Sequence, residues 1–241
     1  MNWIFPIAGK GKRVKDLGSF KPFIIINNKK LIEWFLISIK NKFKKNDTLY
    51  FITTIEFEKK YKVTKNIKKI LKKTKVRNKV FIKLIVKTPN GPALTVSSIF
   101  EDLNKKNTCI IVNSDQIVDF NFPEKINPKK IYIPIHFNTH GKSSYANIAQ
   151  NGKITSIFEK KLTSYYASSG IYIFGSYKIL KKSYELFNMN LNKNEINLSD
   201  IINNYLKMKK TFAQSLETYL KYDLGNLKDI KYFNNLIKRI F

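Results

Sequence analysis

The sequence of 241 residues predicts an α/β protein whose mixed, mostly parallel sheet carries helices on both faces. In the first half of the chain, short apolar runs alternate with segments whose apolar residues recur at helical spacing, an order typical of parallel sheets. In the second half, strand-like runs follow one another, with Asn151-Gly152 as a hairpin turn between two of them. Antiparallel strands are therefore expected to extend the same sheet.

The first half is expected to begin with a buried strand, Asn2–Ala8, that ends in a glycine loop. A short apolar run, Phe23–Ile26, and a turn at Asn27–Lys30 come before a helix at Leu31–Ile39, where apolar residues share one face. The elements that follow are a strand at Leu49–Thr53, a basic helix within Tyr61–Lys75, a strand at Val80–Val86, a helix at Pro92–Leu103 and a buried strand at Thr108–Asn113.

The second half is expected to add four strands and then three helices, with one further strand between the last two helices. The strands are Ile131–Phe137, Tyr145–Ala149, Lys153–Phe158 and Ala167–Phe174; the helices are Ser176–Phe187, Leu198–Lys207 and Leu227–Arg239, and the late strand is Thr211–Leu216. No internal repeat or low-complexity linker interrupts this series. One domain over residues 1–241 is therefore predicted.

The chain is strongly basic, with 45 Lys and Arg against 17 Asp and Glu and a formal net charge of +28. Thirteen of these cations lie within Lys59–Lys87, a stretch that nucleic acid or an anionic membrane surface would attract. However, Val63, Ile67, Ile70 and Leu71 recur at helical spacing, which places the lysines on the opposite, solvated face of an amphipathic helix. Abundant Lys, Asn, Ile, Phe and Tyr, all encoded by A/T-rich codons, favour a genomic base bias over nucleic-acid binding.

Composition also limits the class of protein. The 43% hydrophobic content excludes a disordered polybasic tail, and no apolar run reaches the ~18 residues that a membrane helix needs. A single cysteine, Cys109, and two histidines, His136 and His140, exclude an internal disulfide and the usual zinc sites. A cytoplasmic protein without a membrane partner is expected, and homo-oligomerisation is left open.

Three features are candidates for chemistry. The loop Gly9–Arg13 follows the first strand, where glycine permits close approach of a phosphate and Lys and Arg add charge; an ordinary turn is the alternative. Asp115 lies just beyond the buried strand Thr108–Asn113, at the edge where α/β sheets bind ligands, and its carboxylate is a natural Mg²⁺ ligand. Asp223 is a second such carboxylate, and capping is the alternative for both.

Together with other segments, these features resemble the sugar-nucleotide pyrophosphorylases, also called sugar-1-phosphate nucleotidyltransferases. The matching segments, in order, are Phe5–Arg13 (family pattern Pro-x-Ala-Gly-x-Gly-Thr-Arg), Lys21–Phe23 (Lys-Pro-Met/Leu), Asn27–Trp34 (Asn-Gly-Lys-Pro-Leu-Ile-Glu-Trp), Thr88–Ala93 (Gly-x-Ala), Asn113–Gln116 (Asn-Cys/Gly-Asp-Gln/Asp), Glu159–Lys161 (Glu-Lys-Pro/Lys), Ser169–Tyr172 (x-Gly-Ile-Tyr) and Tyr222–Asn226 (x-Asp-x-Gly-Thr). The resemblance covers nearly the whole chain. It implies a Rossmann-like fold of the nucleotide-diphospho-sugar transferase type, with a nucleotide-binding half at 1–118 and an acceptor-binding half at 119–241.

The resemblance implies a role for each matching residue. Residues Ala8, Gly9, Gly11, Lys12, Arg13, Lys21, Asn90, Gly91 and Asp115 would bind the nucleotide. Among them, Arg13 would neutralise the leaving pyrophosphate, Lys21 would contact the α-phosphate region, and Asn90 and Gly91 would contact the base. Lys160, Ser169 and Gly170 would bind the acceptor, with Lys160 on its phosphate. Asp115 and Asp223 would hold Mg²⁺, so that Arg13, Lys21 and Lys160 form the catalytic set.

The implied reaction needs no protein nucleophile, because an oxygen of the acceptor phosphate attacks the α-phosphorus of an NTP directly. Positioning and charge neutralisation then provide the catalysis. Lys12 and Asn226 depart from the family pattern, where Thr is usual, while Gln116 and the segment 139–146 are most similar to a branch associated with capsule genes. Two alternatives stay open: cytidylyl transfer to a non-sugar phosphate, such as phosphocholine or a phosphorylated amino acid, and a non-catalytic relative that binds polyanions.

Overall fold

Four parallel strands form the first part of the sheet in the computed structural model, which describes residues 1–11, 14, 20–187 and 195–240. The central strand β1 (Asn2–Pro6) pairs in parallel with β4 (Thr48–Thr54) on one side and β6 (Cys109–Val112) on the other, and β5 (Lys79–Ile85) pairs with β4. The parallel strands predicted from the first half are confirmed.

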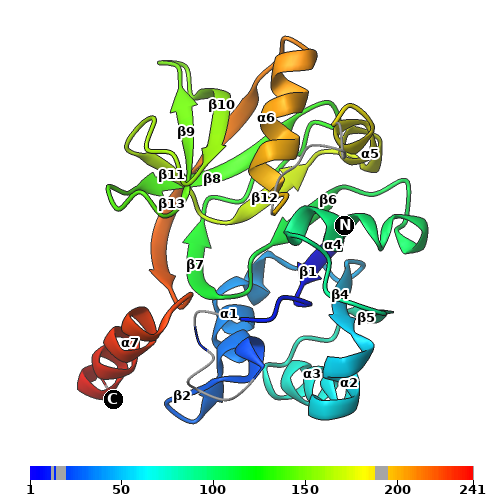
Figure 1. Cartoon of the computed structure of the whole chain (residues 1–241), viewed down its shortest axis with the longest axis vertical. Helices are drawn as coiled ribbons and strands as arrows, with labels where there is room; N and C mark the ends of the chain where they lie inside the picture. The colour runs from blue at the N-terminus through cyan, green and yellow to red at the C-terminus, as the bar shows by residue number, and fades with distance from the viewer. Residues whose placement is uncertain (12–13, 15–19, 188–194, 241) are drawn as a thin grey trace.

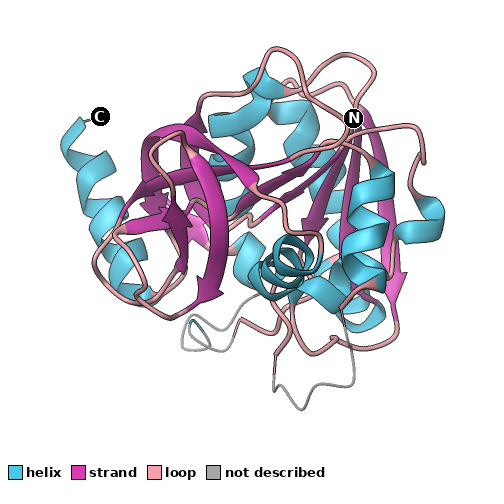
Figure 2. Cartoon of the chain, turned by 90° about the horizontal axis from the view of Figure 1, so that it is seen from above, coloured by secondary structure: helices cyan, strands magenta, loops and turns pink. Residues whose placement is uncertain are grey.

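Helices cover both faces of this part of the sheet (Figure 2). On one face, Trp3 and Phe5 of β1 pack with α1 (Leu31–Ile39) and α3 (Val63–Lys73). On the other face, Ile4 joins the cluster that contains α4 (Pro92–Ser97), α5 (Tyr177–Glu185) and α6 (Leu198–Met208). Because successive strand residues point to opposite faces and both faces of β1 are covered, Trp3, Ile4 and Phe5 are all apolar, while the buried Asn2 side chain donates a hydrogen bond to the Asn104 carbonyl.

The second half of the chain adds antiparallel strands to the same sheet, as predicted. They are β12 (Ile171–Phe174), β8 (Ile131–Phe137), β11 (Tyr166–Ser168), β9 (Ser144–Ile148), β10 (Lys153–Glu159), β13 (Ala213–Asp223) and β7 (Gln116–Phe120). The order across the sheet is β5-β4-β1-β6-β12-β8-β11-β9-β10-β13-β7, and β13 also runs parallel to β8 (Figure 1). The sheet is therefore mixed: β5, β4, β1 and β6 are parallel neighbours at one end, and β13 with β8 is a further parallel pair.

The remaining elements are short, except for the last helix. They are β2 (Ile25–Ile26) with β3 (Lys29–Lys30), α2 (Ile55–Tyr61), the 3₁₀ turns η2 (Lys21–Phe23), η3 (Lys40–Lys42) and η4 (Phe100–Asp102), and α7 (Leu227–Ile240). Helix α7 packs through Ile230, Phe233 and Ile237 on a third apolar cluster that includes Leu31 of α1 and Leu224. None of the helices in the described residues has the length and apolar character to cross a bilayer.

Several predicted boundaries were wrong, each for a local reason. The single strand expected at Ala167–Phe174 is divided into β11 and β12, because Gly170 adopts a positive φ of 67° between them. The helix expected at Pro92–Leu103 ends at Ser97, where the hydroxyls of Ser97 and Ser98 donate to carbonyl groups of the preceding turn.

Two strands at the far end of the sheet were also misjudged. Strand β13 continues seven residues past the predicted end at Leu216, to Asp223, and β7 was not predicted at all. The two pair as an antiparallel ribbon, in which β7 is short and mostly buried, whereas the extension of β13 is half-buried or exposed and lacks the apolar pattern of a core strand. Their pairing depends on residues about a hundred positions apart, beyond the reach of local propensity.

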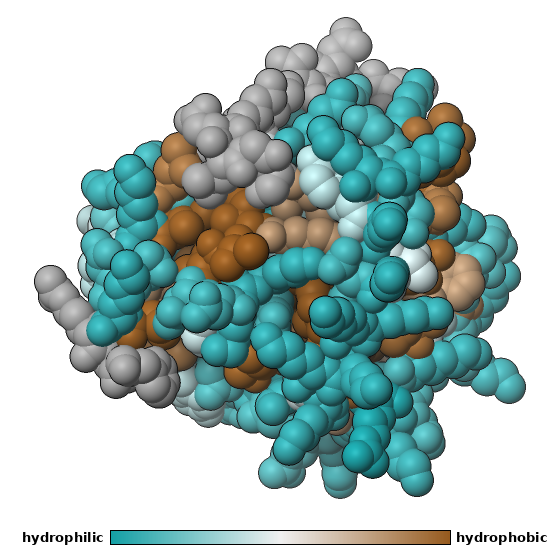
Figure 3. Space-filling view, turned by 90° about the horizontal axis from the view of Figure 1, so that it is seen from below, coloured by the Kyte–Doolittle hydropathy of each residue, from teal (hydrophilic) through white to brown (hydrophobic). Residues whose placement is uncertain are grey.

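The basic segment within Tyr61–Lys75 forms an amphipathic helix, as its spacing predicted. In α3, Val63, Ile67, Ile70 and Leu71 are buried while the lysines between them face solvent. The face of the molecule in Figure 3 is covered mostly by hydrophilic side chains around a central apolar area. The lysines of α3 therefore belong to a solvated surface of a helix that is held by its apolar side.

We expect Ile67→Ala to lower the free energy of unfolding by about 2–4 kcal/mol, because it leaves a cavity beneath α3. The exposed neighbour Lys68→Ala should change it by less than about 0.5 kcal/mol. Urea unfolding of the two variants measures the difference. Equal losses from both substitutions would contradict the assignment of the buried face.

Candidate active site at the carboxyl ends of the parallel strands

Two loops meet where the parallel strands end. The loop after β1 contains Gly9, which is exposed and has no atom within 4 Å of the position a Cβ would take. The loop after β5 is held against it by Thr88, whose hydroxyl donates to the Ala8 carbonyl over 2.9 Å. Backbone around Gly9 is thus open to a ligand at the edge where α/β sheets usually bind one. Lys12 and Arg13 lie outside the described residues.

The predicted base-binding residues, Asn90 and Gly91, have a packing role in this second loop. Gly91 has a φ of 113°, and a Cβ on it would lie 2.2 Å from the Ile196 carbonyl oxygen. The Asn90 carbonyl accepts a hydrogen bond of 2.9 Å from the Ile196 amide. Glycine is therefore required at 91 by the crossing backbone, and contact of either residue with a base stays a prediction.

An ion pair joins Lys21 to Asp115 at the centre of the site. Lys21 begins η2 and packs its Cβ 3.1 Å from the position a Cβ on Gly11 would occupy, so it lies against the glycine loop. Asp115 follows β6. Burial raises the pKa of its carboxyl, but the ammonium groups of Lys21 and Lys221 outweigh this effect, and the pKa lies below its usual range. Asp115 is therefore ionised at neutral pH.

The second predicted metal ligand, Asp223, comes from the last residue of β13, the strand beside β7. Asp223 is paired in register with Gln116, and the amide of Leu224 donates to the Asp115 carbonyl oxygen over 2.8 Å. The position of a Cβ on Gly225 would lie 3.6 Å from Asp115 Oδ2 and 3.9 Å from Lys21 Nζ. The turn after β13 thus closes over the Lys21–Asp115 pair.

A lysine that sequence reasoning missed neutralises Asp223. Lys221 Nζ lies 2.5 Å from Asp223 Oδ1, and the Lys221 side chain is only 7% exposed. The signal was present in the sequence, since residues two apart in a strand share a face. It was not recognised because the strand was expected to end at Leu216.

The predicted acceptor residues Ser169 and Gly170 lie beside the carboxyl end of β6. A Cβ on Gly170 would approach Asn113 Nδ2 to 2.9 Å, and the Gly170 carbonyl accepts from the Asn113 amide over 2.8 Å. The Ser169 carbonyl accepts from Gln116 Nε2 over 2.6 Å. The close approach at Gly170 is therefore made by Asn113, and these residues are brought next to the segment that carries Asp115.

Lys160, the other predicted acceptor residue, lies at the end of β10 with a positive φ of 51°. Its ammonium is 3.8 Å from Glu159 Oε1, and its side chain is 44% exposed. Glu159 Oε2 accepts hydrogen bonds from Ser144 Oγ and Ser199 Oγ, at 2.5 and 3.2 Å. In the described part of the chain, Lys160 has no ion pair with Asp115 or Asp223. It is a separate positive charge, positioned by Glu159, which is itself held by hydrogen bonds from two serines.

The donor set fits a magnesium ion that shares its coordination with a substrate. The side chains of Asp115 and Asp223 are 38% and 50% exposed, so both carboxylates are accessible. Residues 1–11, 14, 20–187 and 195–240 contain no group of three or more His, Cys, Asp and Glu that could hold a metal. Mg²⁺ is typically bound by one or two carboxylates together with substrate phosphates, and this pair satisfies that requirement.

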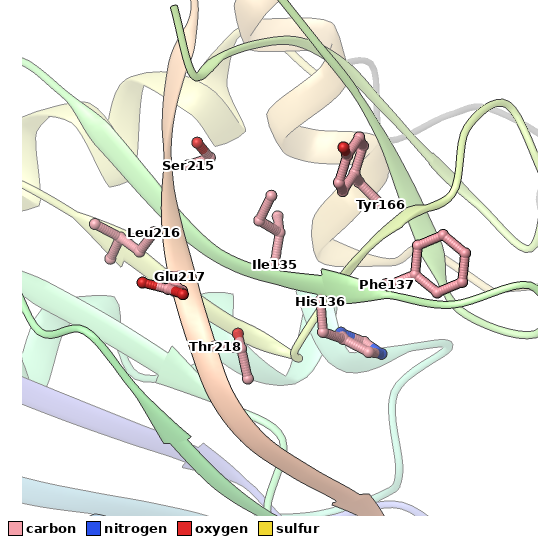
Figure 4. A pocket seen from close by; sticks show the side chains of 8 residues that line it. All are labelled: Ile135, His136, Phe137, Tyr166, Ser215, Leu216, Glu217 and Thr218. Atoms are coloured by element: carbon pink, nitrogen blue, oxygen red, sulfur yellow. The ribbon is translucent and has the colours of Figure 1, made fainter.

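A pocket of about 330 Å³ opens between β8, β11 and β13, in the second half of the chain (Figure 4). His136 lies in its lining, with Nδ1 3.3 Å from Ser169 Oγ. Burial, and after it the positive charge of Lys221, lowers the pKa of His136 to about 4. The imidazole is therefore neutral at physiological pH, and it lies between the pocket and Ser169.

Comparison with known proteins gives one family and a consistent fold. The nucleotidyl transferase family model matches residues 7–239. A nucleoside-diphosphate-sugar pyrophosphorylase from Vibrio cholerae is similar in structure, with a TM-score of 0.82 and 17% identity over 97% of this chain and 99% of that one. No curated protein matches the chain in sequence.

Two further solved structures have the same fold. An inositol-1-phosphate CTP transferase from T. maritima has a TM-score of 0.74 and 14% identity over 99% of this chain and 95% of that one. A UDP-glucose pyrophosphorylase in complex with UDP-glucose has a TM-score of 0.75 and 14% identity, with 100% of this chain and 99% of that one covered.

We expect Gly91→Ala to lower the free energy of unfolding by about 2–4 kcal/mol, because the new Cβ meets the Ile196 backbone at a positive φ. Gly9→Ala should leave stability nearly unchanged, since its Cβ would enter open space. Thermal or urea unfolding compares the two. A Gly91→Ala protein as stable as the Gly9→Ala protein would show that the backbone crossing is not tight.

The depressed pKa of His136 predicts a pH effect on stability. Between about pH 4 and pH 6.5 the unfolded chain binds a proton at this residue that the folded chain does not, so stability should rise with pH across that window. His136→Gln should reduce the slope, whereas His140→Gln, at an exposed position, should not. Urea unfolding at several pH values measures the slopes, and identical slopes for the two variants would refute the assignment.

Proposed function

The chain belongs to the nucleotidyl transferase family, and we propose that it transfers the NMP group of an NTP to a sugar 1-phosphate, with release of pyrophosphate. The observation that carries the proposal is the Lys21–Asp115 ion pair beside the open glycine loop, at the carboxyl ends of the parallel strands. A cation and an ionised carboxylate at this edge, with a second carboxylate at Asp223, suit two phosphorylated substrates and a metal ion.

In the proposed reaction an oxygen of the acceptor phosphate forms a bond to the α-phosphorus while the bond from that phosphorus to pyrophosphate breaks. The backbone amides of Gly9 and Gly11 would bind the nucleotide phosphates, and Lys21 would neutralise charge at the α-phosphate. Arg13 would bind the departing pyrophosphate, and Lys160 would fix the acceptor phosphate. Mg²⁺, held by Asp115 and Asp223, would supply further charge neutralisation between the two substrates.

The acceptor half of the site would be formed by Lys160, Ser169 and Gly170, and the base would lie near Asn90 and Gly91. Support for this division comes from position, because Ser169 and Gly170 adjoin Asn113 whereas the loop of Asn90 adjoins Ala8. The sequence resemblance alone supports a role in surface polysaccharide or capsule biosynthesis in the cytoplasm.

A second candidate is cytidylyl transfer to a non-sugar phosphate. The similarity of the fold to an inositol-1-phosphate CTP transferase supports it, because that protein accepts a phosphate ester outside the sugar phosphates. A non-catalytic relative that binds polyanions is the remaining candidate, and retention of both Asp115 and Asp223 weighs against it.

We expect pyrophosphate release when the protein is incubated with Mg²⁺, one of CTP, UTP, GTP or dTTP, and the correct member of a panel of sugar 1-phosphates and non-sugar phosphate esters. Asp115→Asn should lower kcat/KM roughly 10²-fold or more, because it removes the negative charge that would hold Mg²⁺ against the reacting phosphates. Asp102→Asn, which removes a carboxylate paired with Lys83 at 2.7 Å, serves as the control and should change it less than about twofold.

The identity of the active acceptor separates the two catalytic candidates. Turnover confined to a non-sugar phosphate with CTP would replace the first candidate by the second. Silence across the whole panel, with a folded protein, would refute both.

A further inference from the structure

Asp115 and Asp223 are each paired with a lysine in the structure, and the two pairs have the same arrangement. Lys21 is 19% exposed and its partner Asp115 is 38% exposed; Lys221 is 7% exposed and Asp223 is 50% exposed. In both pairs the lysine side chain is the less exposed of the two, and the carboxylate side chain is the more accessible to a ligand.

Each of the two carboxylates is paired with an ammonium group, so the two pairs are neutral without any added cation; Asp229 is a further carboxyl group whose charge interacts with those of Asp223 and Lys221. A bare divalent ion that approaches Asp115 and Asp223 meets the repulsion of two fixed positive charges that already satisfy the carboxylates. The effect of Lys221 extends over the cluster, because its charge also lowers the pKa of Asp115 and of His136. His136, held neutral, adds no charge to offset that of Lys221.

Lys221 is the less expected member of the cluster. A lysine this deeply covered gives up hydration, a cost that only a partner such as Asp223 can offset. Lys221 does not help Asp223 to bind a metal ion, since its positive charge repels the ion. Its position is better suited to preventing a metal from binding alone.

We propose that Lys221 is a resident counter-cation, which holds Asp223 in the free protein and makes divalent-metal binding conditional on the nucleotide. The inference rests on the proposed function for the identity of the second ligand. The phosphates of an NTP carry the negative charge that the free site lacks, and they offer both further oxygen ligands to a metal and acceptors to the ammonium groups. The metal then binds as a nucleotide complex and not before it.

The test measures Mn²⁺ binding directly, by the electron paramagnetic resonance signal of free Mn²⁺, in the absence of substrates. Wild-type protein should bind Mn²⁺ weakly, and a non-hydrolysable NTP analogue should strengthen binding at least about tenfold. Lys221→Met keeps the length of the side chain but removes the charge, and should strengthen binding of Mn²⁺ alone at least about tenfold.

Three further variants make the result specific. Lys72→Met removes one positive charge at an exposed position of α3 and should leave Mn²⁺ binding unchanged. Lys221→Gln gives a second neutral side chain at the same place in case the methionine variant does not fold. Adding Asp223→Asn to Lys221→Met should abolish the gain in Mn²⁺ affinity. The carboxylate that pairs with Lys221 in the wild type, and that would bind the ion in the single variant, is then lost.

Mn²⁺ affinity in folded Lys221→Met or Lys221→Gln no greater than in wild type and Lys72→Met would overturn the inference. So would a gain that persists when Asp223 is replaced, since the ion would then bind elsewhere. The measurement is independent of turnover. An active enzyme with unchanged Mn²⁺ binding would refute only the role of Lys221, whereas an inert protein with the expected gain would refute only the proposed reaction.

Discussion

The ion pair between Lys21 and Asp115 joins three segments of the candidate site that are far apart in the chain. Lys21 lies against Gly11 in the loop after the first strand, and Asp115 follows the strand that pairs with it. The turn at Gly225 brings the end of β13 to the same two side chains. Because opposite charges at short range must be placed accurately to repay their dehydration, the pair fixes the positions of three segments from distant parts of the chain.

The net charge of +28 has two different structural meanings. Most lysines, such as those of α3, extend from apolar elements into solvent and form a hydrophilic surface. Lys21 and Lys221 are instead covered by the fold and held by carboxylates. The proposed chemistry would depend on this small covered group, while the surface lysines would act at long range, by attracting anionic substrates in a manner that salt weakens.

Two of the glycines that match family motifs, Gly91 and Gly170, are required by the protein's own packing, whereas Gly9 is open. A Cβ at position 91 would collide with the backbone of Ile196, and one at position 170 would crowd the side chain of Asn113. A motif glycine can therefore shape a site indirectly, by allowing two loops to approach, whether or not a ligand also touches it. For this reason a sequence match identifies such positions more reliably than it identifies what they contact.

The sequence alone determined the alternation of strands and helices in the first half, the bounds of α1, and the positions of the glycine loop and the two candidate aspartates, because each depends on local periodicity or on a short motif. Ribbon β7–β13, the break at Gly170 and the environments of Lys221 and His136 were decided by the tertiary structure. Each of these arises from pairing between segments far apart in the chain, such as Asp223 with Gln116 and Asn113 with Gly170. Burial and charge at a residue are set by such neighbours, and local sequence carries no record of them.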